Sequence, residues 1–470
     1  MSSAKLFIFT ILSFVLVTGG INLTPTTPQL FAQFDVPRIT MDHNLKIEIV
    51  SKGVIKFPTS MAFLGPNDIL VLEKNEGTVK RILNGTVLSE PLLRVNVANQ
   101  NESGMLGIAV TTKHFLNQNK KEDIKQEYRP DTVFVFLYYT ETKGKDGNYV
   151  IGSKEPTSNR LYRYEFVDNK LVNPKLLLEL PTTPAAFHNG GKITIGPDNN
   201  IYLTVGDLGI FNASQLPTLV QNLKDGQESD GSGGILRITQ NGQIVGKGIL
   251  GKEHSLSLYF AYGIRNSFGI DFDPVTGNLW DTENGLQVGD EINQVKPGFN
   301  SGWVKVQGVW ELRNQTIIGI FNNTKQLVNF KGTGKYSSPE FVWKQIVGPT
   351  DIKFLNSIKL GKDYENDIFV GDFHNGYLYH FDLNNDRTQL SLQKPLIDKM
   401  ADNKDELEKV TFAKGFGGIT DLEVGPDGYL YVLGPYFGGS NCGSIIHPNE
   451  HCVPYNSANI GSIFRIVPVK

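Results

Sequence analysis

A single histidine heads the stretch AAFHNGGKITIGPDNNIYLTVGD, residues 185–207. Most of this stretch predicts two strands joined by a Pro-Asp-Asn-Asn turn, because apolar and β-branched residues lie on either side of the turn. His188 precedes the first strand and is followed by Asn-Gly-Gly, so we expect it on the rim of a loop. An imidazole in such a place is suited to proton transfer near neutral pH. The alternative is an ordinary loop histidine followed by turn glycines.

Two cysteines form a second group with chemistry of its own. Cys442 and Cys452 bracket the polar segment NCGSIIHPNEHC. In an oxidising compartment we expect them to form one disulfide that closes this loop. The alternative is a metal site that also uses His447 and His451, although this spacing is not that of a standard zinc finger.

The elements that position these residues are short strands. Helical periodicity is nearly absent, and short apolar-alternating runs are separated by Gly, Asp, Asn and Pro turns. One pattern recurs: an apolar strand, a Gly-Pro-Asp-like turn, a strand rich in aromatic and β-branched residues, and a further strand. Its copies span residues 61–82, 131–166, 193–238, 270–285, 362–383 and 422–466.

The recurring pattern predicts an all-β fold, a six-bladed β-propeller with four-stranded antiparallel blades. A meander of this size cannot bury both of its faces alone, so neighbouring units must pack against each other. Loops on one face of a propeller converge on its axis, where residues far apart in sequence share a site. We therefore expect the His188 loop at the central channel.

The N-terminus has the pattern of an export signal. A lysine at position 5 precedes an apolar run and then small residues, which is typical of a signal peptide or N-terminal anchor over residues 1–20. Residues 21–44 are rich in Thr and Pro and are interpreted as a linker, and residues 45–470 as the propeller. We therefore expect an extracytoplasmic protein, secreted or anchored at the cell surface, whose contact with the membrane is through the N-terminus only.

The charge balance argues against nucleic acid as a partner. The chain holds 45 lysines and arginines against 48 aspartates and glutamates. These charges form no basic stripe along the sequence of the kind that binds a phosphate backbone. We therefore expect no nucleic acid among the partners of this protein.

Five short motifs resemble those of the soluble quinoprotein sugar dehydrogenases, also called the glucose/sorbosone dehydrogenase family. They occur in the family's order: ESGMLGIAV (102–110), HNGGK (188–192), YGIRNSFG (262–269), ENG (283–285) and GDEINQVKPGFNSGW (289–303). The weaker repeats extend the resemblance over about residues 45–467. Members of this family are six-bladed propellers that use pyrroloquinoline quinone (PQQ) and calcium. The resemblance implies an enzyme that oxidises an aldose hydroxyl and passes the electrons to an unknown acceptor.

The resemblance also implies roles for individual residues. His188 is the base that takes the proton of the sugar C1 hydroxyl while hydride goes to the quinone. Arg265 and Asn266 contact quinone and sugar oxygens, and a guanidinium suits an oxygen on which negative charge develops. The alternative for Arg265 is a structural bridge between two blades through an acid.

Calcium ligands are implied in the last two motifs. The carbonyls of Gly285 and Leu286 hold the cofactor calcium in this resemblance, with Leu286 standing where the family usually has proline. Glu291 corresponds to the acid of a second, structural calcium site, and Ser301 stands at the position of that site's tyrosine. The alternative for Glu291 and its neighbour Asp290 is a solvated turn.

Two departures from the family concern the cofactor's negative charge. Glu102 stands at the position of a glutamine that helps to hold the cofactor. Gly418 and Thr420 replace two arginines that hold the tricarboxylate, which removes charge-assisted binding. Lys192 and Lys353 are candidates to supply the missing cations, and we count Glu102 and Lys192 among the expected cofactor-binding residues.

Two other functions remain open from the sequence. The first is a propeller without cofactor that serves as a binding or adhesion module, because one fold hosts many functions. The second is a lactonase-type hydrolase, which needs a calcium ion ringed by side-chain oxygens that the repeats do not supply. The identity of the sugar and of the electron acceptor is not encoded in any motif.

Overall fold

The computed structural model of the protein describes residues 37–111, 132–209, 218–435 and 461–469. By its internal contacts the chain divides into two units, Met1–Phe34 and Asp35–Lys470, and every described element belongs to the second. The predicted signal peptide or anchor and both cysteines lie outside the described residues, so export and the disulfide stay predictions. Within the described ranges, no helix has the length and apolar character needed to cross a membrane.

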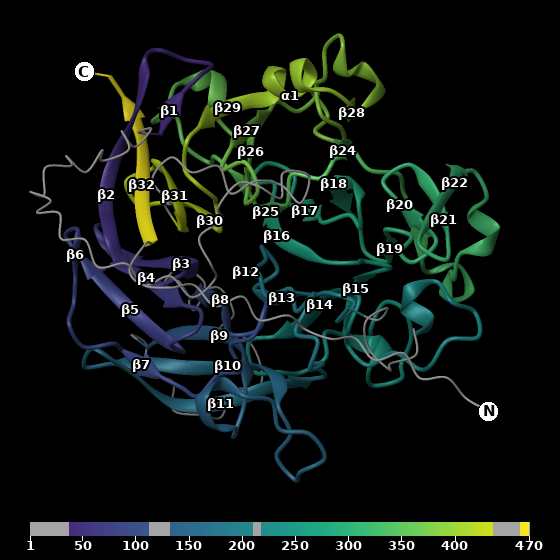
Figure 1. The fold of residues 1–470 in the computed structure, drawn as a ribbon, viewed down its shortest axis with the longest axis horizontal. Coiled ribbons are helices and arrows are strands. Elements are labelled where there is room, and N and C mark those ends of the chain that lie inside the picture. The colour runs from purple at the N-terminus through teal and green to yellow at the C-terminus, as the bar shows by residue number, and fades with distance from the viewer. Residues whose placement is uncertain (1–36, 112–131, 210–217, 436–460, 470) are drawn as a thin grey trace, which may run out of the picture. The chain divides into compact units, whose positions relative to one another are not determined.

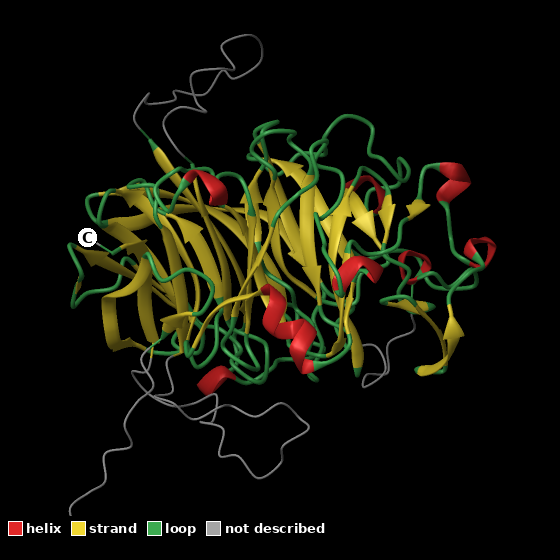
Figure 2. Cartoon of the chain, turned by 90° about the horizontal axis from the view of Figure 1, so that it is seen from above, coloured by secondary structure: helices red, strands yellow, loops and turns green. Residues whose placement is uncertain are grey.

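Strands dominate the described structure, and loops join them at both ends of the sheets (Figures 1 and 2). The described residues include one α-helix, α1 (Lys404–Val410), whose first turn is capped by the Asn403 side chain. Short 3-10 helices also occur: η2 (Lys145–Gly147), η4 (Leu219–Gln221), η5 (Leu256–Leu258), η6 (Thr324–Gln326), η7 (Phe330–Gly332), η8 (Lys362–Tyr364) and η9 (Leu396–Asp398).

Each sheet is named by its inner strand, and the first three inner strands along the chain are β3, β8 and β12. The β3 sheet holds β3 (Pro58–Gly65), β4 (Asp68–Glu73), β5 (Thr78–Leu83), β6 (Thr86–Val87) and β7 (Leu93–Arg94). The β8 sheet holds β8 (Met105–Val110), β9 (Val133–Glu141), β10 (Ser158–Val167) and β11 (Lys170–Leu180). The β12 sheet holds β12 (Ile193–Ile195), β13 (Asn200–Val205), β14 (Gly234–Thr239), β15 (Tyr259–Tyr262), β19 (Phe299–Asn300) and β23 (Lys335–Tyr336).

The remaining sheets follow along the chain. The β16 sheet holds β16 (Ser267–Phe272), β17 (Leu279–Glu283), β18 (Val288–Val295), β24 (Phe341–Gln345) and β28 (Met400–Ala401). The β25 sheet holds β25 (Pro349–Phe354), β26 (Ile368–Asp372), β27 (Leu378–Phe381), β29 (Thr411–Lys414) and β1 (Arg38–Ile39). The β30 sheet holds β30 (Asp421–Val424), β31 (Leu430–Pro435), β32 (Gly461–Pro468) and β2 (Leu45–Ile55). A separate small sheet holds β20 (Val306–Gln307), β21 (Trp310–Arg313) and β22 (Thr316–Ile320).

The inner strands contact one another in sequence order and then close on themselves. Strand β3 contacts β8, β8 contacts β12, β12 contacts β16, β16 contacts β25, β25 contacts β30, and β30 contacts β3 (Figure 1). A hydrophobic cluster lies between each of these sheets and the next, so both faces of every one of these sheets pack against a neighbouring sheet. The sheets therefore surround a common centre, where the inner strands meet.

Strands from the two ends of the described chain complete the last sheet. β2 pairs antiparallel with β32, so the N-terminal strand is hydrogen-bonded to the C-terminal one. β1 pairs with β29 as well, which means that residues 38–39 belong to the sheets. The folded unit thus begins before residue 45, where the sequence placed the end of the linker.

The predicted repeats coincide with strands of the structure. Residues 193–207, for example, form β12 and β13, joined by the expected turn at residues 196–199. The sheets themselves differ in size, because short parallel strands extend the β12 and β16 sheets beyond four strands. The recurring pattern therefore located the meanders, whereas the added edge strands had no repeated pattern to indicate them.

Candidate active site

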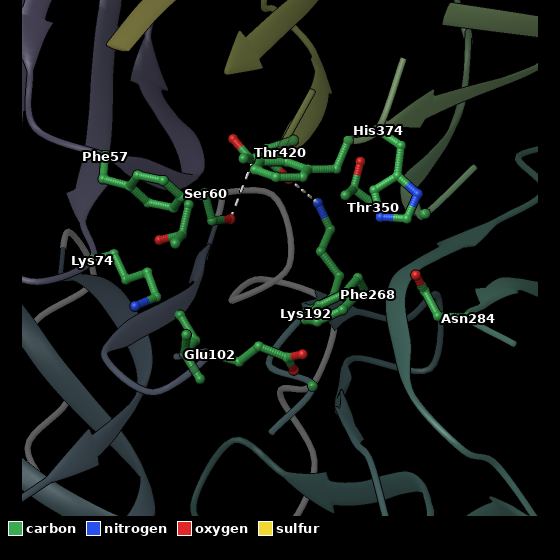
Figure 3. Close-up of a pocket in the computed structure, with 16 residues that line it drawn as sticks. Phe57, Ser60, Lys74, Glu102, Lys192, Phe268, Asn284, Thr350, His374 and Thr420 are labelled. Carbon is green, nitrogen blue, oxygen red and sulfur yellow. Dashed lines mark hydrogen bonds and ion pairs between the residues drawn. The ribbon is translucent and has the colours of Figure 1, made fainter. Parts of the chain in front are cut away.

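A cavity lies at the centre of the sheets and collects residues from several of them (Figure 3). Its wall is formed where inner strands begin and where the next strand of each meander ends. These two points lie at the same edge because the two strands are antiparallel. The wall includes Lys74, Glu102, Lys192, Asn284, His374 and Thr420.

His188 is held by a buried carboxylate beside this cavity. Its Nδ1 lies 2.5 Å from Oδ1 of Asp207, which also accepts a hydrogen bond from the Gly209 backbone N–H. The other oxygen of Asp207 accepts a hydrogen bond from the indole of Trp303 at 2.7 Å. Because the carboxylate accepts a hydrogen bond from Nδ1–H, the neutral imidazole keeps its lone pair on Nε2. Nε2 is therefore the nitrogen available to act as a base.

The charge of Asp207 is stabilised by its neighbours. Burial opposes ionisation, but the facing His188 and the nearby Arg265 outweigh it and hold the pKa of Asp207 below its ordinary value. Asp207 is 1% exposed. Residue 207 thus presents a negative charge to the imidazole, which fixes the orientation of the ring.

Two glycines near His188 lie so close to other backbone atoms that a side chain would clash there. His188 itself has a φ of +55°, a left-handed conformation that non-glycine residues seldom adopt. A Cβ atom on Gly206 would lie 2.4 Å from the His188 carbonyl oxygen, and one on Gly190 would lie 2.5 Å from the Thr204 carbonyl oxygen. Glycine at these two positions therefore lets the loop lie against the end of β13.

Glu102 joins two other predicted residues. Its Oε2 accepts a hydrogen bond from the His188 backbone N–H at 2.7 Å and one from the Asn266 amide at 3.4 Å. Glu102 also lines the cavity. The carboxylate at this position therefore anchors the His188 loop to the loop that carries Asn266.

Arg265 follows β15 and is almost fully buried, with 8% exposed. Its Nη1 donates to the carbonyl oxygens of Asn284 and Gly285, both at 2.9 Å. Its guanidinium carbon lies 5.6 Å from the centre of the Trp303 ring. The Arg265 carbonyl accepts a hydrogen bond from the backbone N–H of Asp207 at 2.8 Å, which ties this loop to the His188–Asp207 pair.

The carbonyls of Gly285 and Leu286, the predicted ligands of the cofactor calcium, belong to a turn that is held by the side chain of Asp290. The backbone N–H of Gly285 donates to Oδ1 of Asp290 at 2.7 Å, and the other Asp290 oxygen accepts from Val347 and Gly348. Leu286 is half-buried beside them. Asp290 and Glu291 are 1% and 2% exposed, so the interpretation of these two acids as a solvated turn is wrong.

Glu291 belongs to a cluster of buried acids on β17 and β18. The strand register places Glu283 opposite Glu291 and Asp281 opposite Asn293, so all four side chains share one face. Ser301 donates to Glu283 at 2.6 Å and lies 3.3 Å from Glu291. Burial raises the pKa of Glu283 to about 7, and burial together with the Glu283 charge raises those of Asp281 and Glu291 well above their ordinary values.

The side-chain oxygens of this cluster are suitable ligands for calcium. Both carboxylate oxygens of Asp281, the side-chain oxygen of Asn293 and that of Gln307 are buried and have no hydrogen-bond partner among the described residues. Buried acceptors without donors are costly, and a cation satisfies them. Carboxylate and amide oxygens are the ligands that calcium prefers. Ser301 adds a hydroxyl oxygen at the position where the family has tyrosine.

The cavity also has features that fit a flat cofactor. Phe57 and Phe373 lie on its wall with ring centres 6.5 Å apart, and Phe268 lines it as well. His374 lines the same wall, and its buried Nδ1 has no hydrogen-bond partner within the part of the chain that the structure describes. Aromatic faces suit a planar ring system, and a buried imidazole nitrogen suits a polar group on it.

The two lysines expected to replace the missing arginines have other partners. Lys192 lines the cavity, but its ammonium lies 2.7 Å from Asp351 and 2.5 Å from Asp421. Lys353 pairs with Glu423 at 3.1 Å and lines a different pocket. Both charges therefore neutralise acids of the chain itself. Where the arginines were expected, Thr420 contributes a hydroxyl to the cavity wall.

Site residues that the sequence analysis did not single out include Asp207, Trp303, Lys74 and His374. Three of them share a signal that the repeats contain. Lys74, Asp207 and His374 follow the second strand of a meander within two residues, at the edge that faces the cavity. The position directly after the aromatic-rich strand of a repeat is therefore the sequence signal for these three residues.

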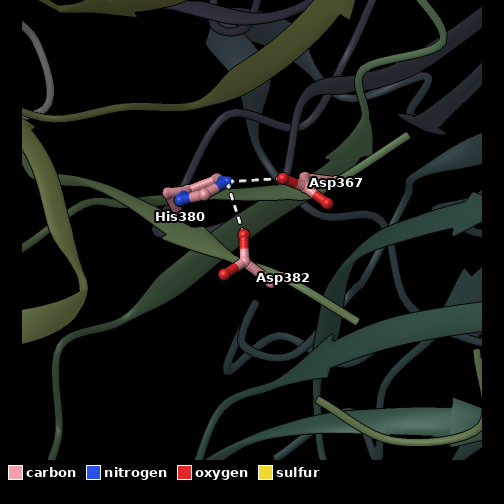
Figure 4. A group of neighbouring side chains, drawn as sticks. All are labelled: Asp367, His380 and Asp382. Atoms are coloured by element: carbon pink, nitrogen blue, oxygen red, sulfur yellow. Dashed lines mark hydrogen bonds and ion pairs between the residues drawn. The ribbon is translucent and has the colours of Figure 1, made fainter. Parts of the chain in front are cut away.

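A group of ionisable side chains away from the cavity has a different explanation (Figure 4). His380 Nε2 lies 2.9 Å from Asp367 and 3.5 Å from Asp382, with all three ligand atoms within 4.8 Å of one another. In the register, His380 lies opposite Phe369, as Arg81 lies opposite Leu70 in the β3 sheet. Arg81 pairs with Asp68 at 2.6 Å. The group is thus the β25-sheet counterpart of a structural strand-to-strand bridge.

The match with a known family decides the identity. Residues 55–438 match the family model described as Glucose / Sorbosone dehydrogenase. The chain belongs to this family. It is 25% identical over 389 residues to the Aldose sugar dehydrogenase YliI of Escherichia coli strain K12, covering 82% of this chain and 88% of that protein. It is 32% identical over 193 residues, 37% of this chain and 40% of the relative, to Quinoprotein glucose dehydrogenase B of Acinetobacter calcoaceticus.

Solved structures share the fold of this family member. The soluble aldose sugar dehydrogenase of Escherichia coli in its apo-form superposes with a TM-score of 0.60 at 19% identity, covering 90% of this chain and 100% of that one. The PQQ-bound aldose sugar dehydrogenase of Streptomyces coelicolor gives a TM-score of 0.58 at 20% identity, covering 92% and 99%. Together with the closed succession of sheets, this likeness identifies the fold as a β-propeller.

Proposed function

We propose that the protein oxidises the C1 hydroxyl of an aldose in the central cavity, with PQQ as hydride acceptor and calcium as its partner ion. The observation that carries this proposal is the His188–Asp207 pair beside the cavity. A buried acid that fixes Nδ1 leaves Nε2 as a general base. Family membership supports the same reaction class, and the relatives are aldose sugar and glucose dehydrogenases by name.

The chemistry divides between the cofactor and the chain. PQQ, when bound, supplies the quinone that accepts the hydride from C1 of the sugar. His188 takes the hydroxyl proton on Nε2, and Asp207 stabilises the imidazolium that forms. Arg265 places a positive charge in a buried site, where it stabilises an oxygen that gains negative charge. Asn266 offers an amide for orienting the sugar or quinone oxygens.

Calcium and PQQ are proposed to occupy distinct parts of the site. The carbonyls of Gly285 and Leu286 are the proposed ligands of the cofactor calcium. In this structure the Gly285 carbonyl accepts a hydrogen bond from Arg265, which calcium would displace. A second calcium is held by Glu291 and the buried oxygens around it, which have no donor among the described residues. Glu102 and Lys192 border the PQQ-binding cavity, where Glu102 positions the His188 loop.

The scaffold is proposed to be a six-bladed propeller with four-stranded blades, extended at some edges by further strands. The succession of contacts between inner strands supports this count. Export, by secretion or through an N-terminal anchor, is proposed from the pattern of residues 1–20. In that location the electron acceptor is an extracytoplasmic partner.

A direct test uses purified protein freed of cofactor. With PQQ and calcium added, it is expected to reduce an artificial dye when given aldoses. His188→Ala should lower turnover by roughly 10²- to 10⁴-fold, because a general base is lost. His254→Ala is the matched control, because His254 is exposed and outside the cavity.

The test also decides between the enzyme and the binding module. Because Gly418 and Thr420 replace two cations, PQQ has to be titrated to high micromolar concentration. Absence of both PQQ binding and dye reduction across a broad panel of sugars would falsify the enzyme proposal and favour a cofactor-free binding module.

A further inference from the structure

His374 lies in the wall of the central cavity, and its imidazole has a nitrogen that the described chain leaves without a partner (Figure 3). This nitrogen, Nδ1, is shielded from solvent and has no hydrogen-bond partner among the described residues. In Figure 3, His374 and Thr350 lie on one side of the cavity, and Phe57 and Lys74 lie on the other. A buried polar atom without a partner is costly, so its presence in a cavity wall points to a group that enters the cavity.

The loop that carries His374 follows β26 and is tied to the turn before β25. The N–H of His374 donates to the Val347 carbonyl at 3.1 Å, and the N–H of Phe373 donates to the Gly348 carbonyl at 2.9 Å. A Cβ atom on Gly348 would lie 3.1 Å from Nε2 of His374 and 3.2 Å from two of its ring carbons. Gly348 has a φ of +67° and also lines the cavity. The imidazole therefore lies against bare backbone at residue 348, where a side chain would crowd it.

Asp372, the last residue of β26, fixes the same loop from within. One of its oxygens accepts hydrogen bonds from the backbone N–H groups of Asn375 at 2.9 Å and Tyr377 at 3.2 Å. The other oxygen accepts from the Asn375 amide at 2.9 Å and from the Tyr379 hydroxyl. Asp372 is completely buried. The chain alone therefore sets the conformation of the His374 loop, and a loop that is ordered before binding lowers the entropic cost of holding a ligand.

Other polar side chains on this side of the wall already bind the chain itself. The Thr350 hydroxyl donates to the Ile419 carbonyl at 2.8 Å. The Asn284 amide donates to the Pro349 carbonyl at 2.8 Å. Each of these two side chains thus has a backbone acceptor, whereas Nδ1 of His374 has none among the described residues. The partner that Nδ1 lacks is therefore expected on the cavity side of the ring.

We propose that Nδ1–H of His374 donates a hydrogen bond to an oxygen of PQQ and thereby positions the cofactor in the cavity. This inference rests on the proposed function, because it assigns a residue to the cofactor of that reaction. The polar edge of PQQ consists mainly of carboxylate and carbonyl oxygens, which accept hydrogen bonds, so the imidazole nitrogen that meets one of them carries the proton. His374 thus acts in cofactor binding, and His188 remains the base that takes the sugar proton.

The test measures PQQ binding itself, by equilibrium dialysis of the full chain at saturating calcium and without sugar. Leucine and asparagine both branch at Cγ and are similar in size, but only asparagine can place an N–H where Nδ1 lies. His374→Leu should weaken PQQ affinity by roughly 5- to 100-fold, because a hydrogen bond to a neutral or charged oxygen is lost. His374→Asn should stay within about threefold of wild type, because it keeps that donor. His254→Leu, at an exposed position outside the cavity, is the control and should bind like wild type.

The outcomes separate this inference from the function on which it rests. If wild type binds PQQ and His374→Leu binds it equally well, His374 does not hold the cofactor, and the proposed reaction stands. The inference then fails even if His374→Leu raises the KM for the sugar, because the nitrogen meets the sugar instead. If His374→Asn binds PQQ as weakly as His374→Leu, the N–H is not what matters, and the inference is wrong.

If wild type does not bind PQQ at high micromolar concentration, both proposals are overturned. A melting curve for each cofactor-free variant confirms that the comparison is between folded proteins.

Discussion

At the scale of single residues, the site depends on one buried carboxylate as much as on the histidine. Asp207 accepts hydrogen bonds from His188, Trp303 and Gly209, so the imidazole cannot rotate without breaking a charged contact. Replacing Asp207 by asparagine removes the negative charge and keeps the shape of the side chain. Asn at position 207 can present an N–H to Nδ1 and thereby move the lone pair away from Nε2.

We therefore expect Asp207→Asn to lower kcat by roughly 10²- to 10⁴-fold, with a smaller effect on KM, because the base is present in the wrong tautomer. Steady-state dye reduction with PQQ and calcium measures this effect. Asp198→Asn, at the exposed turn of the same hairpin, should leave kcat unchanged. An Asp207→Asn enzyme with wild-type kcat would show that His188 is not oriented through Nδ1.

At the scale of elements, the site is built from the ends of strands. Each meander brings the start of its inner strand and the end of its second strand to the same edge, and the cavity wall is the set of those ends. In the pair β17 and β18, the strand register decides which side chains lie on the same face. Because side chains alternate, a shift of one residue would move Glu291 and Asn293 to the opposite face from Asp281 and Glu283.

We expect calcium to stabilise the protein through this pair of strands. In protein free of PQQ, chelation should lower the melting temperature and added calcium should restore it. A ligand at 100 times its Kd stabilises the native state by about 2.7 kcal/mol. Asp281→Ala should remove most of this calcium-dependent shift, and Asp363→Ala, an exposed acid, should not. Equal melting temperatures with chelator and with millimolar calcium would contradict a calcium site at the cluster.

At the scale of the whole molecule, a buried ion network connects the inner strands. Lys192 precedes β12 and pairs with Asp351 of β25 and Asp421 of β30. Asp421 also accepts hydrogen bonds from Ser60 and Met61 of β3. Four sheets are therefore joined near the centre by charges that solvent does not reach. The pairing of β2 with β32 joins the two ends of the folded chain in the same way through backbone hydrogen bonds.

We expect Lys192→Met to destabilise the protein by about 3–5 kcal/mol, because removing one partner leaves buried acids without compensation. Denaturant unfolding of the cofactor-free protein measures this change. Lys46→Met is the matched control, since Lys46 is half exposed and its ion pair with Glu48 is worth at most about 1 kcal/mol. A loss below 1 kcal/mol for Lys192→Met would mean that the network does not hold the sheets together.

The sequence by itself determined the strands, their meander pattern and the family. Alternation of apolar and polar residues is a local property, so it locates β12 and β13 without knowledge of their neighbours. The motifs likewise pointed to the residues of the His188 and Arg265 loops. These features depend only on residues that are close together in the sequence.

Only the tertiary structure decided which charges remain available at the cavity. Lys192 is neutralised by acids 159 and 229 positions away, and no local pattern connects them. Asp290 and Glu291 lie next to a turn, and this position suggested that their side chains are exposed to solvent. In the structure both are buried by neighbouring strands. Lys74 reaches the cavity because Gly104 of another sheet leaves space for its stem. Burial and charge pairing act through space, so they follow from how the sheets pack and not from the order of residues along the chain.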